Sequence, residues 1–184
     1  MDKFIYNIEQ TKLSDIILID SVKQQLRIES DFTDDDSFIQ ELIPDATKLA
    51  EDYTGQTIAL TEFTYTLYNW SGSELTISET PFYSIISLQY KNDLGVMVDI
   101  PDEYIVDKKV GSFTLHFDST VNYKEIVFKF KSGYESSNVP RNIKRAILVK
   151  CSDLYDTERG SYSYNAKSIQ TFERLLAGSV ITRW

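Results

Sequence analysis

The sequence predicts an α+β protein in which a small helical core carries an inserted antiparallel β region. Three observations indicate this: apolar residues recur at helical spacing up to residue 53, they alternate along much of residues 58–134, and a second amphipathic helix begins at Pro140. Two helices that each have one apolar face must bury it, and packing on each other does so. We expect one domain, with a helical part at 15–55, a β insertion at 56–139, a core helix at 140–160 and a C-terminal helix and tail at 161–184.

Two helices are predicted before the β region. Ser21 and Gln24 have the spacing of a capping box, which predicts a short helix over residues 21–27. Thr33 is the expected N-cap of a longer helix, because the three aspartates that follow it lie where the helix dipole favours negative charge. We expect one kinked helix with Pro44 on its outer face and Gly55 as its left-handed cap. The apolar stripe, which keeps its phase through the proline, consists of Phe38, Leu42, Ala46, Leu49 and Tyr53.

Residues 58–134 have the pattern of short antiparallel strands, which predicts a small β-sandwich or barrel-like region. The strand-like segments are TEFTYTLYNW, ELTIS, SIISLQY, GVMVDI, EYIVD, SFTLHF and EIVFKFK, separated by Gly, Asn, Asp and Ser. The region holds 14 of the 24 aromatic residues, and packing within the core and across strands accounts for most of them. The alternative is an exposed platform for a ligand such as a carbohydrate, formed by Tyr68, Trp70, Tyr83 and Tyr123.

The C-terminal part predicts two more helices. Pro140 suits a first helical turn and opens a strong amphipathic helix. Residues 168–178, SIQTFERLLAG, predict a short last helix, and SVITRW is an apolar, aromatic tail. The apolar stripe of the first of these helices consists of Ile143, Ile147, Cys151, Leu154 and Tyr155.

The net charge of −9 is unevenly spread. Residues 1–55 carry 5 basic and 13 acidic side chains (−8), residues 56–139 carry 6 and 11 (−5), and residues 140–184 carry 8 and 4 (+4). An acidic body argues against broad nucleic-acid binding, which requires a basic face. The basic C-terminal segment permits head-to-tail packing of subunits, acidic part against basic part; a solvated surface is the alternative.

The sequence carries no recognisable export signal. The first ten residues lack a basic flank leading into an apolar stretch, and no run approaches the roughly 20 apolar residues of a membrane span. The single cysteine excludes an internal disulfide. We expect a protein without membrane contact, made in a reducing compartment.

No catalytic or metal-binding motif stands out. His116 lies alone in a strand-like segment, where a packing or surface role is favoured, and Cys151 lies on the apolar face of a helix. The stretch DFTDDD lacks the glycine and the final glutamate of a calcium loop. Carboxylate pairs such as Asp102–Glu103 and Asp153–Asp156 are expected by chance among 28 acids, and a hydrolase built on such a pair is the third alternative. We predict that the protein is not an enzyme and needs no cofactor and no metal.

The order of the elements resembles the head–tail connector (adaptor) family of tailed bacteriophages and prophages, in its longer branch with a β insertion. The resemblance rests on an ordered set of short motifs, which together cover residues 15–177. Residues 1–14 and the aromatic loop at 161–165 depart from the family pattern. The motifs are Tyr53–Gly55 at a helix end, Pro81–Tyr90 in a strand pair, Tyr104–Asp107 in a strand, Gly133–Tyr134 in a turn, and Val139–Pro140 opening a helix that ends near Arg159.

The resemblance implies a structural virion protein, made in the cytoplasm of a bacterial host. Members of this family form a ring, usually of twelve subunits, under the portal; the ring extends the DNA channel and docks the next tail or stopper component. DNA would pass through without specific binding, because basic contacts are what hold phosphates. Residues 168–184 would form an arm that engages the portal. Since Trp and Arg dominate interface hot spots, the expected anchors of this arm are Arg174, Leu175, Leu176 and Trp184.

Overall fold

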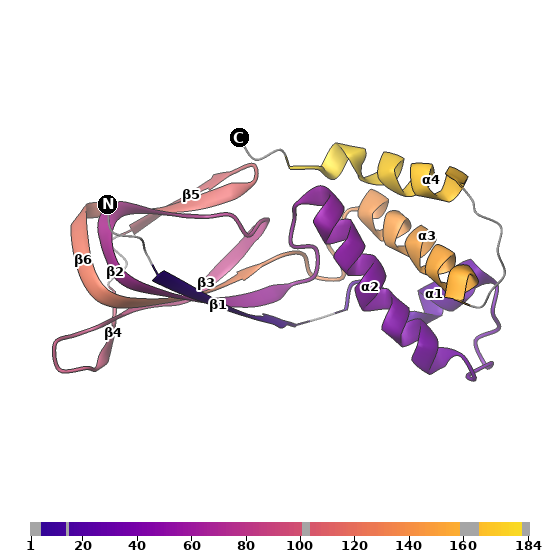
Figure 1. Cartoon of the computed structure of the whole chain (residues 1–184), viewed down its shortest axis with the longest axis horizontal. Helices are drawn as coiled ribbons and strands as arrows, with labels where there is room; N and C mark the ends of the chain where they lie inside the picture. The colour runs from indigo at the N-terminus through magenta and orange to yellow at the C-terminus, as the bar shows by residue number, and fades with distance from the viewer. Residues whose placement is uncertain (1–4, 14, 101–103, 159–165, 182–184) are drawn as a thin grey trace. The chain divides into compact units, whose positions relative to one another are not determined.

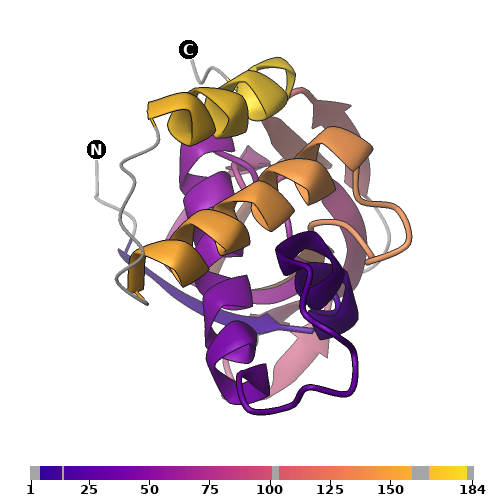
Figure 2. The ribbon, with the colours of Figure 1, turned by 90° about the vertical axis from the view of Figure 1, so that its right-hand side faces the viewer.

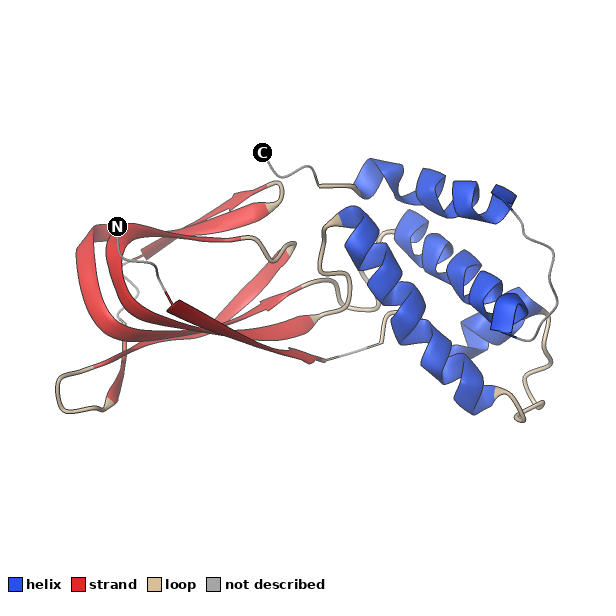
Figure 3. Cartoon of the chain, viewed as in Figure 1, coloured by secondary structure: helices blue, strands red, loops and turns tan. Residues whose placement is uncertain are grey.

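The chain divides into two compact units, each built from segments that are distant in the sequence. The β unit combines residues 1–13 with residues 60–133, and the helical unit combines residues 14–59 with residues 134–184. The computed structural model describes residues 5–13, 15–100, 104–158 and 166–181. Each unit has its own hydrophobic core, and Figure 3 distinguishes the helices from the strands by colour.

The described part of the helical unit contains four helices, with α3 in contact with each of the other three (Figures 1 and 2). Its core includes the fully buried Ile39 and Ala46 of α2 and Ile143 and Ile147 of α3. The predicted packing of the helix before the β region on the helix after it is therefore confirmed. None of the described helices is long and apolar enough to cross a membrane. The helices are α1 (Ile19–Leu26), α2 (Asp36–Thr54), α3 (Arg141–Glu158) and α4 (Ala166–Leu176), followed by a 3₁₀ turn at Ala177–Ser179.

Both N-terminal helices start at residues other than those predicted. Leu18 is the N-cap of α1 and makes no side-chain cap bond, so the capping box predicted at Ser21 is wrong. The N-cap of α2 is Asp35 rather than Thr33. Asp35 also makes no cap bond; its carboxylate accepts a hydrogen bond from the Tyr155 hydroxyl of α3 at 2.5 Å. Tertiary contacts thus override the local capping signals.

α2 is one continuous helix through Pro44, whose side chain is exposed, as predicted. Gly55 follows it with a φ of +69°, which confirms the left-handed cap. The apolar stripe is displaced from the prediction, since Leu49 and Tyr53 remain 41% and 38% exposed. α2 packs against both α1 and α3, so the centre of its buried face differs from the centre of the predicted stripe. The buried apolar residues of α2 are Ile39, Leu42, Ile43, Ala46 and Ala50.

A polar contact between α1 and the start of α2 was not predicted. Lys23 of α1 is only 3% exposed, and its Nζ lies 2.8 Å from Oδ1 of Asp36. The same Nζ donates a hydrogen bond to the carbonyl oxygen of Ser30 at 3.1 Å. A buried ammonium group is tolerated only when it is paired in this way, so the contact fixes the connection between the two helices.

The β unit is one curled antiparallel sheet, which confirms the predicted β region (Figure 1). The strands lie in the order β1-β2-β6-β3-β4, and β5 pairs with β6. Phe113, Phe128 and Phe130 are fully buried, with ring centroids 4.8 to 6.3 Å apart. Aromatic packing is therefore the centre of this core. The strands are β1 (Ile5–Lys12), β2 (Thr61–Ile77), β3 (Phe82–Lys91), β4 (Met97–Asp99), β5 (Tyr104–Lys109) and β6 (Ser112–Ser132).

Two predicted breaks between strands are bends within longer strands. The segments on either side of residues 71–73 are both part of β2, and those on either side of residues 118–123 are both part of β6. The pairing register of β2 shifts between Gly72 and Glu74, and an extra residue of this kind bends a strand. β6 pairs with β2 along one edge, and with β5 and then β3 along the other. Its length lets one strand join all three neighbours.

β1 was not predicted, and it adds an edge strand to the sheet. It pairs antiparallel with the first half of β2, with Ile8 opposite Tyr65. Residues 7–13 are all exposed, so they lack the alternation of buried and exposed residues that predicts a strand. The strand conformation of this segment therefore depends on pairing with β2, about 55 residues away in the chain.

We predict that Lys23→Met lowers the free energy of unfolding by about 2–3 kcal/mol, because it leaves the partly buried Asp36 carboxylate without its cation. The double variant Lys23→Met/Asp36→Ala is expected to lose less than the single variant. Urea denaturation measures both, with Lys48→Met as the control, since the pair of Lys48 with Asp52 is exposed and contributes at most about 0.5 kcal/mol. A single variant as stable as the control would contradict the buried pair.

We also predict that Cys151 is unreactive in the folded protein. Burial raises the pKa of its thiol to about 12, so native protein at pH 8 should resist iodoacetamide, whereas protein in denaturant should react. In the unfolded chain the pKa of the thiol is about 8.5. The contribution of the raised pKa to the free energy of unfolding is fully present below that pH and is lost as the pH rises toward 12. Relative to Cys151→Ala, the wild type should lose up to about 1.4 kcal/mol per pH unit above pH 9; parallel pH profiles of the two proteins would refute this.

Candidate functional site: the anchored C-terminal arm

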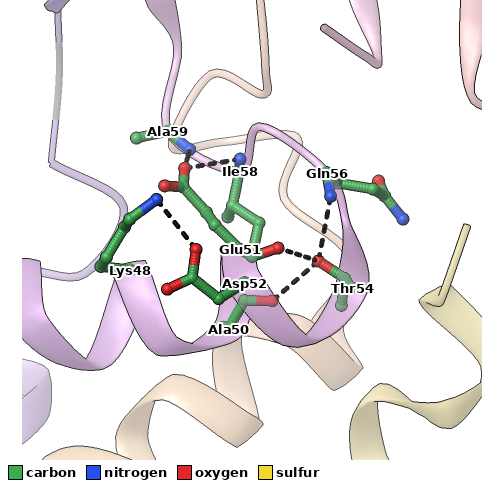
Figure 4. A network of polar contacts seen from close by, with 8 residues as sticks. All are labelled: Lys48, Ala50, Glu51, Asp52, Thr54, Gln56, Ile58 and Ala59. Atoms are coloured by element: carbon green, nitrogen blue, oxygen red, sulfur yellow. Dashed lines mark hydrogen bonds and ion pairs between the residues drawn. The ribbon is translucent and has the colours of Figure 1, made fainter. Parts of the chain in front are cut away.

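The end of α2 is closed by Tyr-Thr-Gly-Gln, residues 53–56. Thr54 is fully buried, and its hydroxyl donates to the carbonyl oxygen of Ala50 at 2.7 Å. The amide of Gln56 donates in turn to the same hydroxyl at 3.4 Å (Figure 4). Gly55 adopts the left-handed conformation, and its amide donates to the carbonyl oxygen of Glu51 at 2.8 Å. The Thr54 hydroxyl is therefore the hydrogen-bond partner of a carbonyl oxygen and an amide at the helix end. Gly55 allows the chain to turn there, because glycine adopts the left-handed conformation without strain.

The carboxylate of Glu51 fixes the chain just beyond this turn. Its Oε1 accepts hydrogen bonds from the backbone amides of Ile58 at 2.8 Å and Ala59 at 3.2 Å (Figure 4). Both residues are buried, so their amides need a partner inside the protein. A carboxylate forms stronger hydrogen bonds than a neutral acceptor does. One side chain of the last helical turn thus determines the path of the following segment.

Residues 166–181, which include the described part of the arm predicted at 168–184, pack on the helical core through α4. Phe172 is 7% exposed and Leu176 is fully buried. The ring of Phe172 packs edge-on against the ring of Tyr53 on α2, with the two centroids 6.0 Å apart. Nζ of Lys150, on α3, lies 5.7 Å from the centroid of the Phe172 ring. Burial of these two apolar side chains contributes roughly 1.5–3 kcal/mol each to holding the arm.

The end of the arm is tied to the turn by hydrogen bonds. The amide of Ile181 donates to the carbonyl oxygen of Thr54 at 2.8 Å, and the side chain of Gln56 donates to the carbonyl oxygen of Ser179. Tyr134 donates its hydroxyl to Oε1 of Gln56 at 3.0 Å, which orients that side chain. Burial raises the pKa of Tyr134, so its hydroxyl stays protonated as a donor at neutral pH.

Asn142 of α3 makes the second tie. Its Nδ2 donates to the carbonyl oxygen of Leu175 at 3.0 Å and to Oγ of Ser179 at 2.8 Å. The arm is therefore held from two sides, by α3 and by the turn after α2. Every one of these ties joins uncharged groups, so neither salt nor pH near neutrality weakens them by screening or titration.

The predicted anchors of the arm differ in how exposed they are. Arg174 is exposed, Leu175 is half-buried, and Leu176 is fully buried in the core of its own chain. Trp184 lies outside the described residues. Arg174 and the edge of Leu175 are thus accessible to a partner, whereas Leu176 holds the helix that carries them. Sequence reasoning missed the ties made by Gln56 and Asn142, because their partners are 123 and 37 residues away.

The other candidate residues that the structure describes do not assemble into a reactive site. His116 is partly exposed on β6, with its Nδ1 3.3 Å from Glu74. Asp102 and Glu103 lie outside the described residues, and Asp153 and Asp156 lie on α3. In the ranges that the structure describes, no group of three or more His, Cys, Asp or Glu side chains is arranged to hold a metal ion.

The four aromatic residues considered for ligand binding do not form one platform. Trp70 is only 4% exposed and packs on Phe117 with ring centroids 5.4 Å apart. Tyr123 is partly buried against Tyr90 at 4.5 Å. Tyr68 pairs with residue 125 of β6, whereas Tyr83 lies where β3 meets residues 131–132, so roughly 20 Å of strand separates them.

We predict that Glu51→Ala lowers the free energy of unfolding by about 1.5–3 kcal/mol, because the buried amides of Ile58 and Ala59 lose their acceptor. Glu51→Gln keeps an acceptor oxygen and should lose about half as much. The control is Asp52→Ala, the neighbouring acid, whose exposed pair with Lys48 contributes at most about 0.5 kcal/mol. Urea denaturation measures all three, and equal losses in Glu51→Ala and Asp52→Ala would contradict the capping role.

The comparisons with known proteins agree with this architecture. The sequence matches the family model of the phage gp6-like head-tail connector protein over residues 16–92. A comparison with curated proteins finds no match. Among solved structures, the chain is similar to one in the neck of an empty gene transfer agent (GTA) particle computed with C6 symmetry, at 12% identity, with a TM-score of 0.77 and coverage of 96% of this chain and 97% of that one.

Two further structures share the fold. A chain in the virion of the native gene transfer agent particle is 14% identical, with a TM-score of 0.71 and coverage of 95% of this chain and 96% of that one. A chain in the neck of the native GTA particle computed with C12 symmetry is 13% identical, with a TM-score of 0.67 and coverage of 96% and 97%.

The family match spans α1, α2, β2 and β3, and the structural likeness extends over nearly the whole chain. The resemblance to the head–tail connector family of tailed bacteriophages, predicted from the order of short motifs, is therefore confirmed by the family match over residues 16–92 and by a fold shared with chains of particle necks.

Proposed function

We propose that this chain is a neck protein of a phage or phage-like particle, which forms a homo-oligomeric ring under the portal. The ring extends the DNA channel and docks the tail or a stopper protein. Support comes from the family match and from similar chains in particle necks computed with C6 and C12 symmetry. Twelve identical copies in a closed ring can carry either symmetry.

The observation that carries the proposal is the anchored C-terminal arm. Residues 166–181 are fixed by two buried apolar side chains and by the ties from Thr54, Gln56 and Asn142. A segment held in this way presents the residues that follow it from a defined point, and binding then loses less conformational entropy. In this proposal Arg174 and Trp184 contact the portal, Leu175 adds its exposed edge, and Leu176 holds α4 in place.

The charge of the chain suits a channel component. The net charge of −9 repels a DNA backbone, so DNA in a channel lined by such a chain moves without being held. The proposed ring thus guides DNA and does not bind it specifically. Assembly in the cytoplasm of the host bacterium, before the tail is added, is part of the same proposal.

The test is the mass of the complex formed with the portal protein encoded in the same genome, measured by native mass spectrometry. We expect a discrete complex with one copy of the chain per portal subunit. No complex with a correctly assembled portal would refute the proposed function.

We predict that a chain ending at Ile181 binds the portal at least about tenfold more weakly, because it lacks the expected Trp184 anchor. Arg174→Ala should weaken binding in the same direction, and both variants should keep the wild-type melting temperature. Lys109→Ala, an exposed cation of the β unit, is the control and should bind normally. Leu176→Ala should instead lower the stability by about 2–5 kcal/mol. Normal binding by the shortened chain would exclude Trp184 as an anchor, and normal binding by Arg174→Ala as well would remove the arm from the interface.

A further inference from the structure

Three cations at the start of α3 have no ion-pair partner in the part of the chain that the structure describes. Arg141 and Arg145 are exposed, and Lys144 is partly exposed. Within the described ranges, no carboxylate lies at ion-pair distance from any of them. Their spacing of three and four residues places them on one face of the helix. We refer to Arg141, Lys144 and Arg145 as the α3 basic patch.

The α3 basic patch lowers the stability of the helix that carries it. The N-terminus of a helix is the positive end of its dipole, so cations there are disfavoured. No acidic residue lies in the first turn to offset them, and Arg141 and Arg145 repel each other at a spacing of four. Departures from local preference of this kind are expected where a surface has a function. The patch is therefore expected to act on another molecule.

α2 carries a surface of opposite charge. Glu41 and Asp45 are exposed and have no ion-pair partner among the described residues, and Asp52 pairs only with the exposed Lys48. At 100° per residue the three acids lie within about 40° of one another around the helix. Leu49, which is 41% exposed, lies beside them. We refer to Glu41, Asp45 and Asp52 as the α2 acidic strip.

The two surfaces do not neutralise each other within one chain. α2 and α3 contact each other through buried side chains, such as Ile43 and Ile147, and the patch and the strip lie on other faces of these helices. In Figure 2 the start of α3 also lies well away from α2. Both surfaces are thus available to a second molecule.

We infer that the α3 basic patch of one copy binds the α2 acidic strip of the next copy, with Leu49 as an apolar contact at its edge. Such a head-to-tail contact uses two different surfaces and forms a ring when the rotation closes. The inference rests on the proposed ring and identifies the surfaces that join its subunits. DNA is the competing partner for a basic patch. The second copy is favoured because the matching acids lie on the same chain, whose net charge of −9 repels DNA.

Charge reversal in the full chain tests this contact. Arg141→Glu/Arg145→Glu and Glu41→Arg/Asp45→Arg each place like charges across it, so each alone should self-associate at least about tenfold more weakly at low salt. Mixed in equal amounts, the two variants regain opposite charges in an alternating ring and should recover assembly. Lys109→Glu/Lys124→Glu lies in the β unit and changes the net charge by as much as Arg141→Glu/Arg145→Glu does; it is the control for that variant and should assemble as the wild type does.

Two measurements make the outcomes distinct: sedimentation velocity of the chain alone, and its copy number on the portal by native mass spectrometry. The melting temperature of Arg141→Glu/Arg145→Glu should equal or exceed that of the wild type, because glutamates suit the start of a helix.

Normal assembly by either reversal variant, or a mixture that fails to recover, overturns the inference and leaves the proposed function standing. A wild type that stays monomeric and does not bind the portal overturns both. Unchanged assembly with loss of duplex DNA binding in Arg141→Glu/Arg145→Glu assigns the patch to nucleic acid instead.

Discussion

The backbone amides of Ile58 and Ala59 donate hydrogen bonds to the Glu51 carboxylate, and these bonds fix the chain at the point where it leaves the helical unit. Ala59 is the last residue of the helical unit before the insertion, and it forms a parallel bridge with Tyr134, the first residue after it. The amide of Tyr134 donates in turn to the carbonyl oxygen of Ile58 at 2.9 Å. The chain therefore leaves and re-enters the helical unit at adjacent points. An insertion with adjacent ends can be long without separating the two helices that must pack together.

The same turn also receives the C-terminal arm, since Thr54 and Gln56 bind Ile181 and Ser179. The Tyr-Thr-Gly motif, which carried part of the family resemblance, thus has a physical role. It ends a helix, it positions the start of the insertion together with Glu51, and it holds the segment proposed to reach the portal. A substitution at Gly55 would disturb all three, because a side chain there requires a strained left-handed backbone.

Local signals in the sequence predicted the features that depend on local chemistry. Pro44 within one helix, the Gly55 cap and the helix after Pro140 follow from backbone preferences and apolar spacing. The features that were missed depend on distant partners. β1 is exposed along residues 7–13 and becomes a strand by pairing with β2. Lysine is a residue type that is normally exposed, but Lys23 is buried with its Nζ beside Asp36 and the carbonyl oxygen of Ser30.

For the candidate site, the sequence predicted a C-terminal helix but not which of its residues face the core. Leu176 and Leu175 are adjacent and chemically identical, yet one is fully buried and the other partly exposed. That difference comes from the orientation of α4 on α3, which no local pattern specifies. The ties from Gln56 and Asn142 were missed for the same reason, because neither amide side chain signals its partner.

The division of the helical unit into residues 14–59 and 134–184 has a consequence during synthesis. A ribosome that adds roughly 5–20 residues per second needs several seconds to make residues 60–133. Throughout that interval the apolar face of α2, including Ile39, Ile43 and Ala50, has been made but α3 has not. The β unit has its strands before the helical unit has its core, so until α3 emerges the apolar face of α2 has only α1 to pack against.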